Sequence, residues 1–334
     1  MRRYLAVFMA DTIASRNCCG YTYGHHRLSL LGNGRGAAPQ KTFSARHFRF
    51  EVGSTPSTSL RKNVVKPLIR WAGSKRQLVP RLSTYWGSQY DRYVEPFVGS
   101  ACLFFNLEPA SALLGDINAD LIQTYRVVQK QPCELSKALR RWRNDRDEYY
   151  GIRALQPENL SEVERAARFI YLNRYCFNGL YRTNRRGQFN VPYGGLKSGS
   201  LPSLNELQAA SQLLSRAQFV SSDFADVLSR VRAGDFVYLD PPFSVAGKRV
   251  FKEYDPSTFS DSDLIRLRRA LLDMDEAGVA FLLSYAECPE GEELSDGFHT
   301  VRVSTRRNIA GFAASRRAAR EILVTNILAT ERQQ

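Results

Sequence analysis

The sequence DFVYLDPPFS (residues 235–244) places a run of strand-forming residues directly before an acid, two prolines and an aromatic residue. Asp and Pro both disfavour β-structure, so we expect a strand that ends at Asp240 and a stiff loop after it. On one interpretation the prolines only end the strand. On the other the edge is functional, because open α/β sheets bind ligands at the carboxyl ends of their strands.

Short apolar runs recur after residue 63 and alternate with helical patterns. The runs are YVEPFV (93–98), SALLG (111–115), QFVSS (218–222), DFVYL (235–239), VAFLLS (279–284), TVRV (300–303) and EILVTN (321–326). The clearest helical pattern covers 261–277, with Ser260 as N-cap and Gly278 at its end. This alternation predicts an α/β fold with a mostly parallel sheet covered on both faces.

Composition limits the classes of protein and partner. The 334 residues are 43% hydrophobic, carry a formal net charge of +14 and include no apolar stretch of membrane-spanning length. Such a basic balance favours nucleic acid or an anionic surface as partner. Six cysteines without a C-x-x-C pair, and only four histidines, argue against a zinc site; free thiols fit a reducing, cytosolic compartment.

Residues 1–62 differ from the remainder in composition. They contain ten Lys or Arg residues and only two acids, Asp11 and Glu51. Their Gly, Ser and Arg content and the lack of any periodic apolar pattern predict a disordered basic extension. An organellar transit peptide, or upstream sequence translated from a mis-assigned start, would give the same composition. We assign the segment no role in the fold.

Residues 131–210 interrupt the alternation of strands and helices. SEVERAARFIYLNRY (161–175) opens with a capping box, Ser161 with Glu164. The basic passage FNGLYRTNRRGQFNVPYGG (177–195) follows and predicts a long loop or hairpin. We therefore expect a catalytic domain made of 63–130 and 211–330, with an inserted helical subdomain at 131–210.

Two strand ends carry the pattern of a nucleoside site. In VEPFVGSACLFF (94–105) the small residues 99–101 would let backbone amides approach a ligand at a strand-to-helix turn. In LLGDIN (113–118) Asp116 ends the next strand, where an acid can accept hydrogen bonds from a ribose diol, although it could also merely cap the next helix. The pair favours a nucleoside-bearing cofactor.

Two further segments have both a functional and a structural interpretation. In KPLIRWAGSK (66–75) Trp71 could cover a ligand and Lys75 could pair with a carboxylate, or the Trp could simply pack on the core.

Residues 173–197 combine Asn and Arg residues with aromatic residues. Asn and Arg side chains can pair with base edges, and aromatic rings can stack on bases. The alternative there is a solvated basic loop. The Asn and Arg residues are Asn173, Arg174, Asn178, Arg182, Asn184, Arg185 and Arg186.

The strand end at 240–243 suits an exocyclic amine. Asp240 and the carbonyl of Pro241 can each accept one hydrogen bond from the NH₂ group, and Phe243 can stack on the ring. Two acceptors draw the amine protons out and localise the nitrogen lone pair, which favours attack on an electrophilic methyl group. A base in a duplex must flip out to reach such a site.

From Lys66 to Asn326 the chain resembles the Dam-type (D12 class, α-group) DNA adenine-N6 methyltransferases, which use S-adenosylmethionine. The matching segments follow the family's order: KPLIRWAGSK, YVEPFVGSACLFF, GDINADLI, YLNRYCFNGLYRTNRRGQFNVPYG, FVSSDFADVL, VYLDPPF and RRNIAGFAASRRAAREILVTN. The resemblance implies a Rossmann-like methyltransferase sheet with an inserted target-recognition subdomain. It also implies methylation of a flipped-out adenine in double-stranded DNA, at GATC or a close variant.

The resemblance also implies a role for individual residues. Those holding the target adenine would be Asp240, Pro241, Pro242 and Phe243. Those binding the cofactor would be Trp71, Lys75, Phe97, Gly99, Asp116, Ile117, Asp223, Phe224 and Asp240. Those contacting DNA would be Arg70, Asn178, Leu180, Arg182 and Pro192. No metal is expected. We expect a cytoplasmic monomer, associated with the nucleoid if the host is bacterial.

Some positions depart from the family pattern. Ala101 replaces the second glycine of the cofactor turn, Phe243 replaces the commoner Tyr, and Arg70 replaces a common Lys. Gly195 and Leu196 stand where Dam proteins have Arg and Tyr. An N4-cytosine DNA methyltransferase, an RNA methyltransferase and a catalytically idle DNA-binding homologue remain as alternatives.

Overall fold

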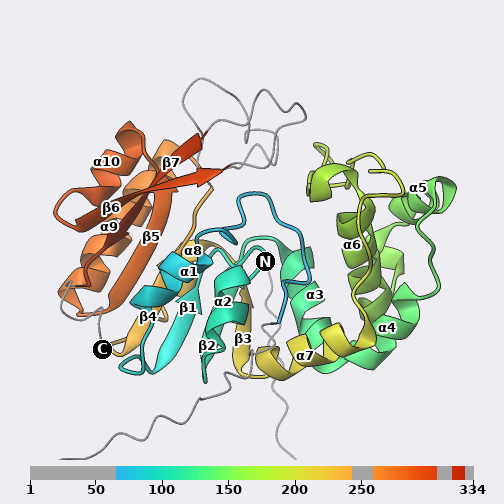
Figure 1. Cartoon of the computed structure of the whole chain (residues 1–334), viewed down its shortest axis with the longest axis horizontal. Coiled ribbons are helices and arrows are strands. Elements are labelled where there is room, and N and C mark those ends of the chain that lie inside the picture. The colour runs from blue at the N-terminus through green and yellow to red at the C-terminus, as the bar shows by residue number, and fades with distance from the viewer. Residues whose placement is uncertain (1–64, 243–258, 307–317, 328–334) are drawn as a thin grey trace, which may run out of the picture. The chain divides into compact units, whose positions relative to one another are not determined.

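The computed structural model describes residues 65–242, 259–306 and 318–327 (Figure 1). The extension at 1–62 and Phe243 lie outside them, and the predictions made for both stay untested. The described strands form one sheet in the order β3-β2-β1-β4-β5-β7-β6. They are β1 Arg92–Glu95, β2 Ala112–Asp116, β3 Ala217–Ser221, β4 Asp235–Leu239, β5 Ala280–Ala286, β6 His299–Arg306 and β7 Ala318–Thr325. Each predicted apolar run overlaps one of these strands.

The strands β1 to β5 are parallel to one another, and β7 is the strand that runs antiparallel to its neighbours. β1 pairs with β2 and β4, β2 with β3, and β4 with β5, all in parallel register. β7 is antiparallel to both β5 and β6 and lies between them. The strand order reverses between β1 and β4, where such sheets form a ligand crevice beyond the carboxyl ends of the strands. The predicted α/β methyltransferase-type fold is thus confirmed.

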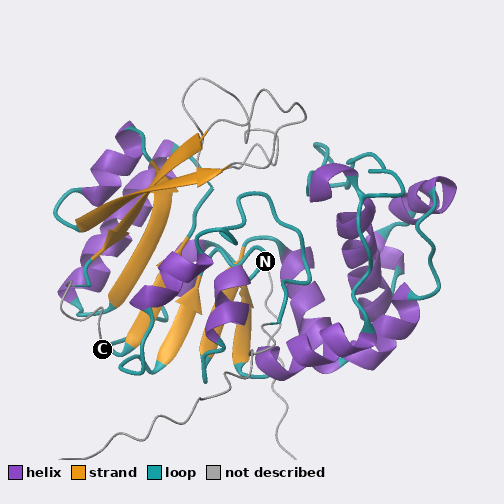
Figure 2. Cartoon of the chain, viewed as in Figure 1, coloured by secondary structure: helices purple, strands orange, loops and turns teal. Residues whose placement is uncertain are grey.

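Helices cover both faces of the sheet (Figure 2). They are α1 Val79–Leu82, α2 Cys102–Leu107, α3 Ala119–Lys130, α4 Pro132–Leu139, α5 Arg146–Ala154, α6 Glu162–Tyr175, α7 Leu204–Leu214, α8 Phe224–Leu228, α9 Asp261–Glu276 and α10 Pro289–Ser295, with 3₁₀ turns η1 Ser83–Tyr85, η2 Pro157–Asn159 and η3 Phe177–Gly179. Alternate strand residues feed two cores, because successive side chains point to opposite faces. Val94 and Val237 pack with α8 and α9, whereas Tyr93 and Phe236 pack with α2 and α3.

Local signals place the helix ends where the sequence predicts them. Ser161 and Glu164 form the capping box that opens α6. Ser260 caps α9, and the chain leaves this helix through Gly278 at φ +65°. Such a left-handed residue after the last turn favours glycine.

Helices α4–α6 and the segment that follows them form the region after β2 and α3. α6 packs against α3, α4 and α5, and Figure 1 shows this group beyond α3, on the β3 side of the sheet. α7 packs against α3 and α4 and extends past residue 210. Between α6 and α7 the chain forms an irregular hairpin with isolated bridges Cys176–Tyr193 and Thr183–Phe189. The division into domains stays a prediction. None of the described helices is long and apolar enough to cross a membrane.

Candidate active site and nucleic-acid interface

The carboxylate of Asp240 lies at the carboxyl end of β4 and is held through one of its two oxygens. The Lys75 ammonium lies 2.9 Å from Oδ1, and the Ser284 hydroxyl donates to the same atom at 3.1 Å. Tyr238 and Ser284 in turn share a hydrogen bond of 3.0 Å. Both Lys75 and Ser284 thus contact Oδ1. The second oxygen of the carboxylate, Oδ2, can accept a further hydrogen bond.

A second carboxylate completes the charge cluster. Glu321 of β7 lies 3.3 Å from the Lys75 ammonium, and all three side chains are mostly buried. Burial lowers the pKa of Lys75, but Asp240 and Glu321 more than offset this and keep it raised. Burial raises the pKa of Asp240, and the Lys75 charge offsets only part of that increase. The prediction that Lys75 pairs with a carboxylate is confirmed.

The glycine turn after β1 is tied to the acid at the end of β2. The Gly99 amide donates to Asp116 Oδ2 at 3.1 Å, and the Asn118 amide donates to Oδ1 at 2.9 Å. Burial raises the pKa of Asp116 to about 6, although both amide hydrogen bonds lower it. Ala101 adopts φ +53°, a left-handed conformation that costs a residue with a Cβ about 1–2 kcal/mol.

Trp71 packs directly on this turn. A Cβ at Gly99 would lie 2.7 Å from Trp71 Cδ1, so only glycine fits beside the indole, and its φ of +43° also favours glycine. Next to Asp116, the Ile117 side chain is 71% exposed although the preceding strand is buried throughout. An exposed aliphatic residue beside a fixed carboxylate and a glycine turn can contact one face of a planar ring.

A second group of predicted cofactor residues is partly aromatic. Phe97 stacks on Phe224, with ring centroids 5.4 Å apart. Asp223 caps α8 through the Ala225 amide at 2.9 Å and forms an ion pair with Arg266 of α9. The Arg266 guanidinium also lies 4.7 Å from the centroid of the Phe224 ring. Contacts thus join the predicted cofactor residues into two groups, one at Trp71–Gly99–Asp116 and one at Phe97–Phe224–Asp223.

The predicted DNA-reading residues gather around the hairpin. Asn178 is exposed and adopts φ +55°, which Asn tolerates better than most residues. The Phe177 amide donates to the carbonyl of Pro192 at 2.9 Å, which joins η3 to the returning strand of the hairpin. Arg182 donates through Nε to Asn190 Oδ1 at 2.8 Å, which orients its guanidinium, and Leu180 is half-buried.

Arg70 has internal partners that the sequence did not reveal. Its guanidinium donates to the carbonyls of Arg174 and Ser198, and its side chain packs against Gly179 and Gly199. Arg70 thereby holds the loops on either side of the hairpin. Its predicted contact with DNA stays a prediction.

Two residues proposed above as base-contacting candidates have structural roles in this region. Asn173 pairs with the Arg70 backbone through both its amide nitrogen and its carbonyl oxygen, at 2.7 and 2.8 Å. Arg174 donates to the carbonyl of Leu68 at 2.9 Å. Both side chains therefore fasten residues 68–70 to α6.

Sequence reasoning missed Ser284, Glu321 and Arg266. Ser284 and Glu321 lie on strands recognised only by their apolar runs, and a single buried polar residue in such a run is the signal that could have found them. Glu95, at the end of β1, is a further buried acid near Asp240 and Asp116, and burial raises its pKa well above the usual range. Arg266 has no sequence signal, since it is one of several arginines on α9.

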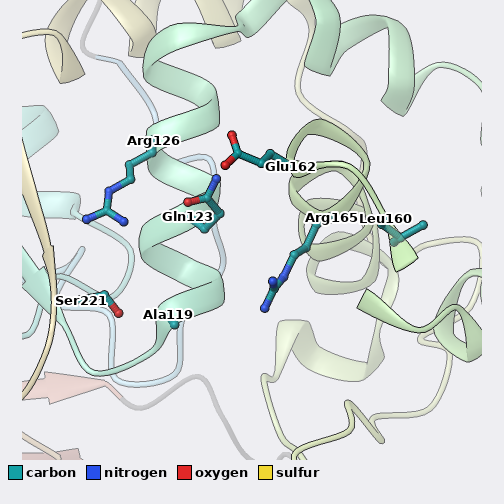
Figure 3. A pocket seen from close by; sticks show the side chains of 7 residues that line it. All are labelled: Ala119, Gln123, Arg126, Leu160, Glu162, Arg165 and Ser221. Carbon is teal, nitrogen blue, oxygen red and sulfur yellow. The ribbon is translucent and has the colours of Figure 1, made fainter. Parts of the chain in front are cut away.

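A separate hollow of about 280 Å³ lies between α3 and the start of α6 (Figure 3). It is lined by Ala119, Gln123, Arg126, Leu160, Glu162, Arg165 and Ser221. Arg126 donates to the Phe219 carbonyl and Arg165 to Asp120, so both guanidinium groups already have partners within the chain. None of the predicted site residues lines the hollow.

Comparisons with known proteins identify the family of the chain. The family model for D12 class N6 adenine-specific DNA methyltransferase matches residues 71–309. The type II methyltransferase M1.LlaDCHI of Lactococcus lactis subsp. cremoris is 35% identical, over 80% of this chain and 98% of that protein. The type II methyltransferase M.MjaIII of Methanocaldococcus jannaschii is 33% identical (73% and 93% covered), and the DNA adenine methylase of Escherichia coli K12 is 30% identical (79% and 95%). The chain belongs to the D12 class N6 adenine-specific DNA methyltransferase family.

Proposed function

We propose that this DNA adenine methyltransferase transfers the methyl group of S-adenosylmethionine to N6 of an adenine flipped out of double-stranded DNA, in GATC or a close variant. The observation that supports the proposal most is the Asp240 carboxylate. Lys75 and Ser284 fix its Oδ1 at the end of a rigid strand, and Oδ2 is available to accept a hydrogen bond. An acceptor held this way can orient an exocyclic amine at little cost in reorganisation.

The residues present fit S-adenosylmethionine. A carboxylate offers about four acceptor positions, and Asp116 uses two for backbone amides, so ribose hydroxyls can still bind there. The exposed Ile117 and the Phe224 edge would border the adenine ring, and Trp71, Lys75, Phe97, Gly99 and Asp223 would line the remainder. When bound, S-adenosylmethionine supplies an electrophilic methyl group.

The chain's own groups orient the target base and its amine. Asp240 and the Pro241 carbonyl each accept a hydrogen bond from the amine, which localises the lone pair of N6 for attack. Pro242 stiffens the backbone at this point, and Phe243 would stack on the adenine. Because a stacked base cannot reach a strand edge, the adenine must leave the duplex.

Expression in a host without adenine methylation tests the proposal. Every modified base on a plasmid isolated from that host is then identified by sequencing. We expect N6-methyladenine at GATC or at sites that differ from it by one base. A plasmid with N4-methylcytosine, or with no methylation from soluble protein, would contradict the proposal. A sharp adenine motif unrelated to GATC would refute only the recognition sequence.

Arg182→Ala should relax the choice of base on the 3′ side of the target adenine. An arginine can donate to both O6 and N7 of guanine, and one such pair contributes about 1–3 kcal/mol of discrimination. Asn190 already orients the guanidinium for such a contact. The same plasmid sequencing, repeated with the variant, measures the change.

In the wild type, Gly195 and Leu196 stand where Dam proteins have Arg and Tyr. Discrimination at the first guanine of GATC should therefore be weaker than in Dam proteins, and the same sequencing measures it.

Arg266→Ala should raise the KM for S-adenosylmethionine several-fold and leave kcat nearly unchanged. Arg266 holds Asp223 and covers Phe224, and both residues are predicted to border the cofactor adenine. The matched control is Arg269→Ala on the same helix, which loses only an exposed ion pair with Asp273. Equal effects of the two variants on KM would argue against the role of Arg266.

A further inference from the structure

Residues 70–75 connect the predicted cofactor site with the hairpin that carries the predicted DNA contacts. At one end of this segment Lys75 forms its ion pair with Asp240. Ser74 and Ser100 share a hydrogen bond of 2.9 Å, which ties the segment to the glycine turn. A displacement of these residues would therefore change the geometry of the cofactor site.

Trp71 extends the same segment to the hairpin. Its indole fills the space next to Gly99 and also stacks on Tyr181, with ring centroids 5.5 Å apart and planes 25° apart. Tyr181 belongs to the ascending strand of the hairpin and directly precedes Arg182. One aromatic pair thus joins the glycine turn to the residue beside a predicted base-reading arginine.

Tyr181 also reaches the second strand of the cofactor site. Burial and the nearby Asp120 carboxylate raise the pKa of its hydroxyl to about 12, and the Asn118 side chain lowers this pKa in part. Asn118 caps α3, and its backbone amide binds Asp116. The neutral Tyr181 hydroxyl therefore lies near the turn that is predicted to hold the ribose.

The other neighbours of Tyr181 belong to the recognition region. Its ring lies 5.3 Å from that of Phe169 on α6 and 5.7 Å from that of Phe189 on the returning strand of the hairpin. A shift of the hairpin on DNA would consequently move a ring that stacks on Trp71, in the Trp71–Gly99–Asp116 group of the cofactor site. Conversely, a ligand at the cofactor site that orders Trp71 or Asn118 would restrict the Tyr181 ring and, through it, the hairpin.

We propose that Tyr181 is a positioning residue that couples binding at the cofactor site to recognition of DNA by the hairpin. The inference rests on the proposed function and gives Tyr181, one of the aromatic residues of the 173–197 passage, a role other than stacking on a base. A side chain ordered by either ligand lowers the entropic cost of binding the other. By thermodynamic linkage, each ligand then tightens the other by the same factor.

The coupling is measured with S-adenosylhomocysteine as probe, because the demethylated cofactor permits no turnover. Its Kd is determined alone and with a saturating duplex that carries the sequence methylated on the plasmid. In the wild type we expect the duplex to tighten probe binding at least about fivefold, the lower end of usual coupling factors, and in Tyr181→Ala less than about twofold. Tyr181→Phe keeps the ring stack and should retain most of the effect.

Two further variants separate coupling from damage to the fold. Tyr181→Leu keeps apolar volume without an aromatic ring, and should lose the coupling even if Tyr181→Ala does not fold. Tyr150→Ala is the matched control: Tyr150 lies in the same region, and its ring packs against Tyr149 and Arg153. This control should retain the wild-type factor.

The possible outcomes distinguish this inference from the function on which it rests. Wild-type coupling that survives in folded Tyr181→Ala or Tyr181→Leu, or that disappears equally in Tyr150→Ala, overturns the role of Tyr181. A wild-type protein that binds the probe and methylates DNA, but shows no tightening by the duplex, overturns the coupling alone. A wild-type protein that neither binds the probe nor methylates DNA overturns the proposed function and the coupling together.

Discussion

Asp240→Ala is expected to lower the single-turnover rate of methyl transfer by about 10²–10³-fold, the usual effect of removing one preorganised stabilising group. Binding of DNA should change little, because Asp240 is mostly buried and is not placed to contact phosphates. The fold should also survive, since Lys75 keeps Glu321 as a counter-ion. Single-turnover rates and salt-matched DNA binding measure the two effects. A variant within threefold of the wild-type rate would rule out the role of Asp240.

Asp240→Asn provides a sharper version of the same test. Lys75 and Ser284 both donate to Oδ1, so they will select the carbonyl oxygen of an asparagine at this position. The NH₂ group of the asparagine then faces the amine of the target base, and two donors oppose each other. The asparagine variant should therefore be about as slow as the alanine variant, although it has nearly the size of the native residue. A nearly active asparagine variant would show that the orientation of this side chain is unimportant.

Lys75→Met is expected to destabilise the protein by about 3–5 kcal/mol, because removing one partner of a buried ion pair leaves uncompensated charge. Lys75 is 5% exposed and lies between two buried carboxylates. Addition of Glu321→Gln to Lys75→Met should restore part of the loss, since one of the two unpaired charges is then absent. Denaturant unfolding at neutral pH measures the free energy of unfolding for each variant.

The control for this experiment is Arg269→Met. Its ion pair with Asp273 is similar in length, 2.8 Å, but the Arg269 side chain is 74% exposed. Exposed pairs contribute about 0–1 kcal/mol, so this variant should remain close to the wild type. A Lys75→Met variant as stable as the control would show that the charge cluster is not a buried unit.

Lys75→Met should also move the acid limb of the pH–rate profile to higher pH. In the proposed function methyl transfer requires ionised Asp240, so the rate is expected to fall as the pH drops through the pKa of this carboxyl. Burial already raises this pKa, and the Lys75 charge opposes the increase. Without Lys75 the pKa rises further, and the pH of half-maximal rate on the acid side should increase. Any residual activity of Lys75→Met is sufficient for this comparison.

Local patterns in the sequence predict a large part of the fold. The seven strands follow from apolar runs, and α6 and α9 follow from their caps, because each signal involves residues within one turn or one strand. The position of Asp240 at a strand end is equally local. These features need no knowledge of how distant segments meet.

The remaining features depend on contacts between distant segments. Glu321 reaches Lys75 only because β7 lies between β5 and β6, an order that no local pattern specifies. Arg70 was predicted as a DNA contact from its place in the family pattern, but its hydrogen bonds to α6 and to Ser198 arise from the packing of the inserted region on residues 68–70. The stack of Trp71 on Tyr181 has the same origin.

The position of β7 has a consequence for the synthesis of the protein. The buried charge cluster joins Lys75, near the start of the described chain, to Glu321, near its end. A ribosome-bound chain cannot complete this cluster until Glu321 has emerged. A truncated product that ends before β7 would carry the hairpin and its arginines but would leave Lys75 and the β5 edge unfinished. Because β7 pairs with both β5 and β6, such a chain would lack this edge of the sheet as well as the charge cluster, and it is expected to methylate no DNA.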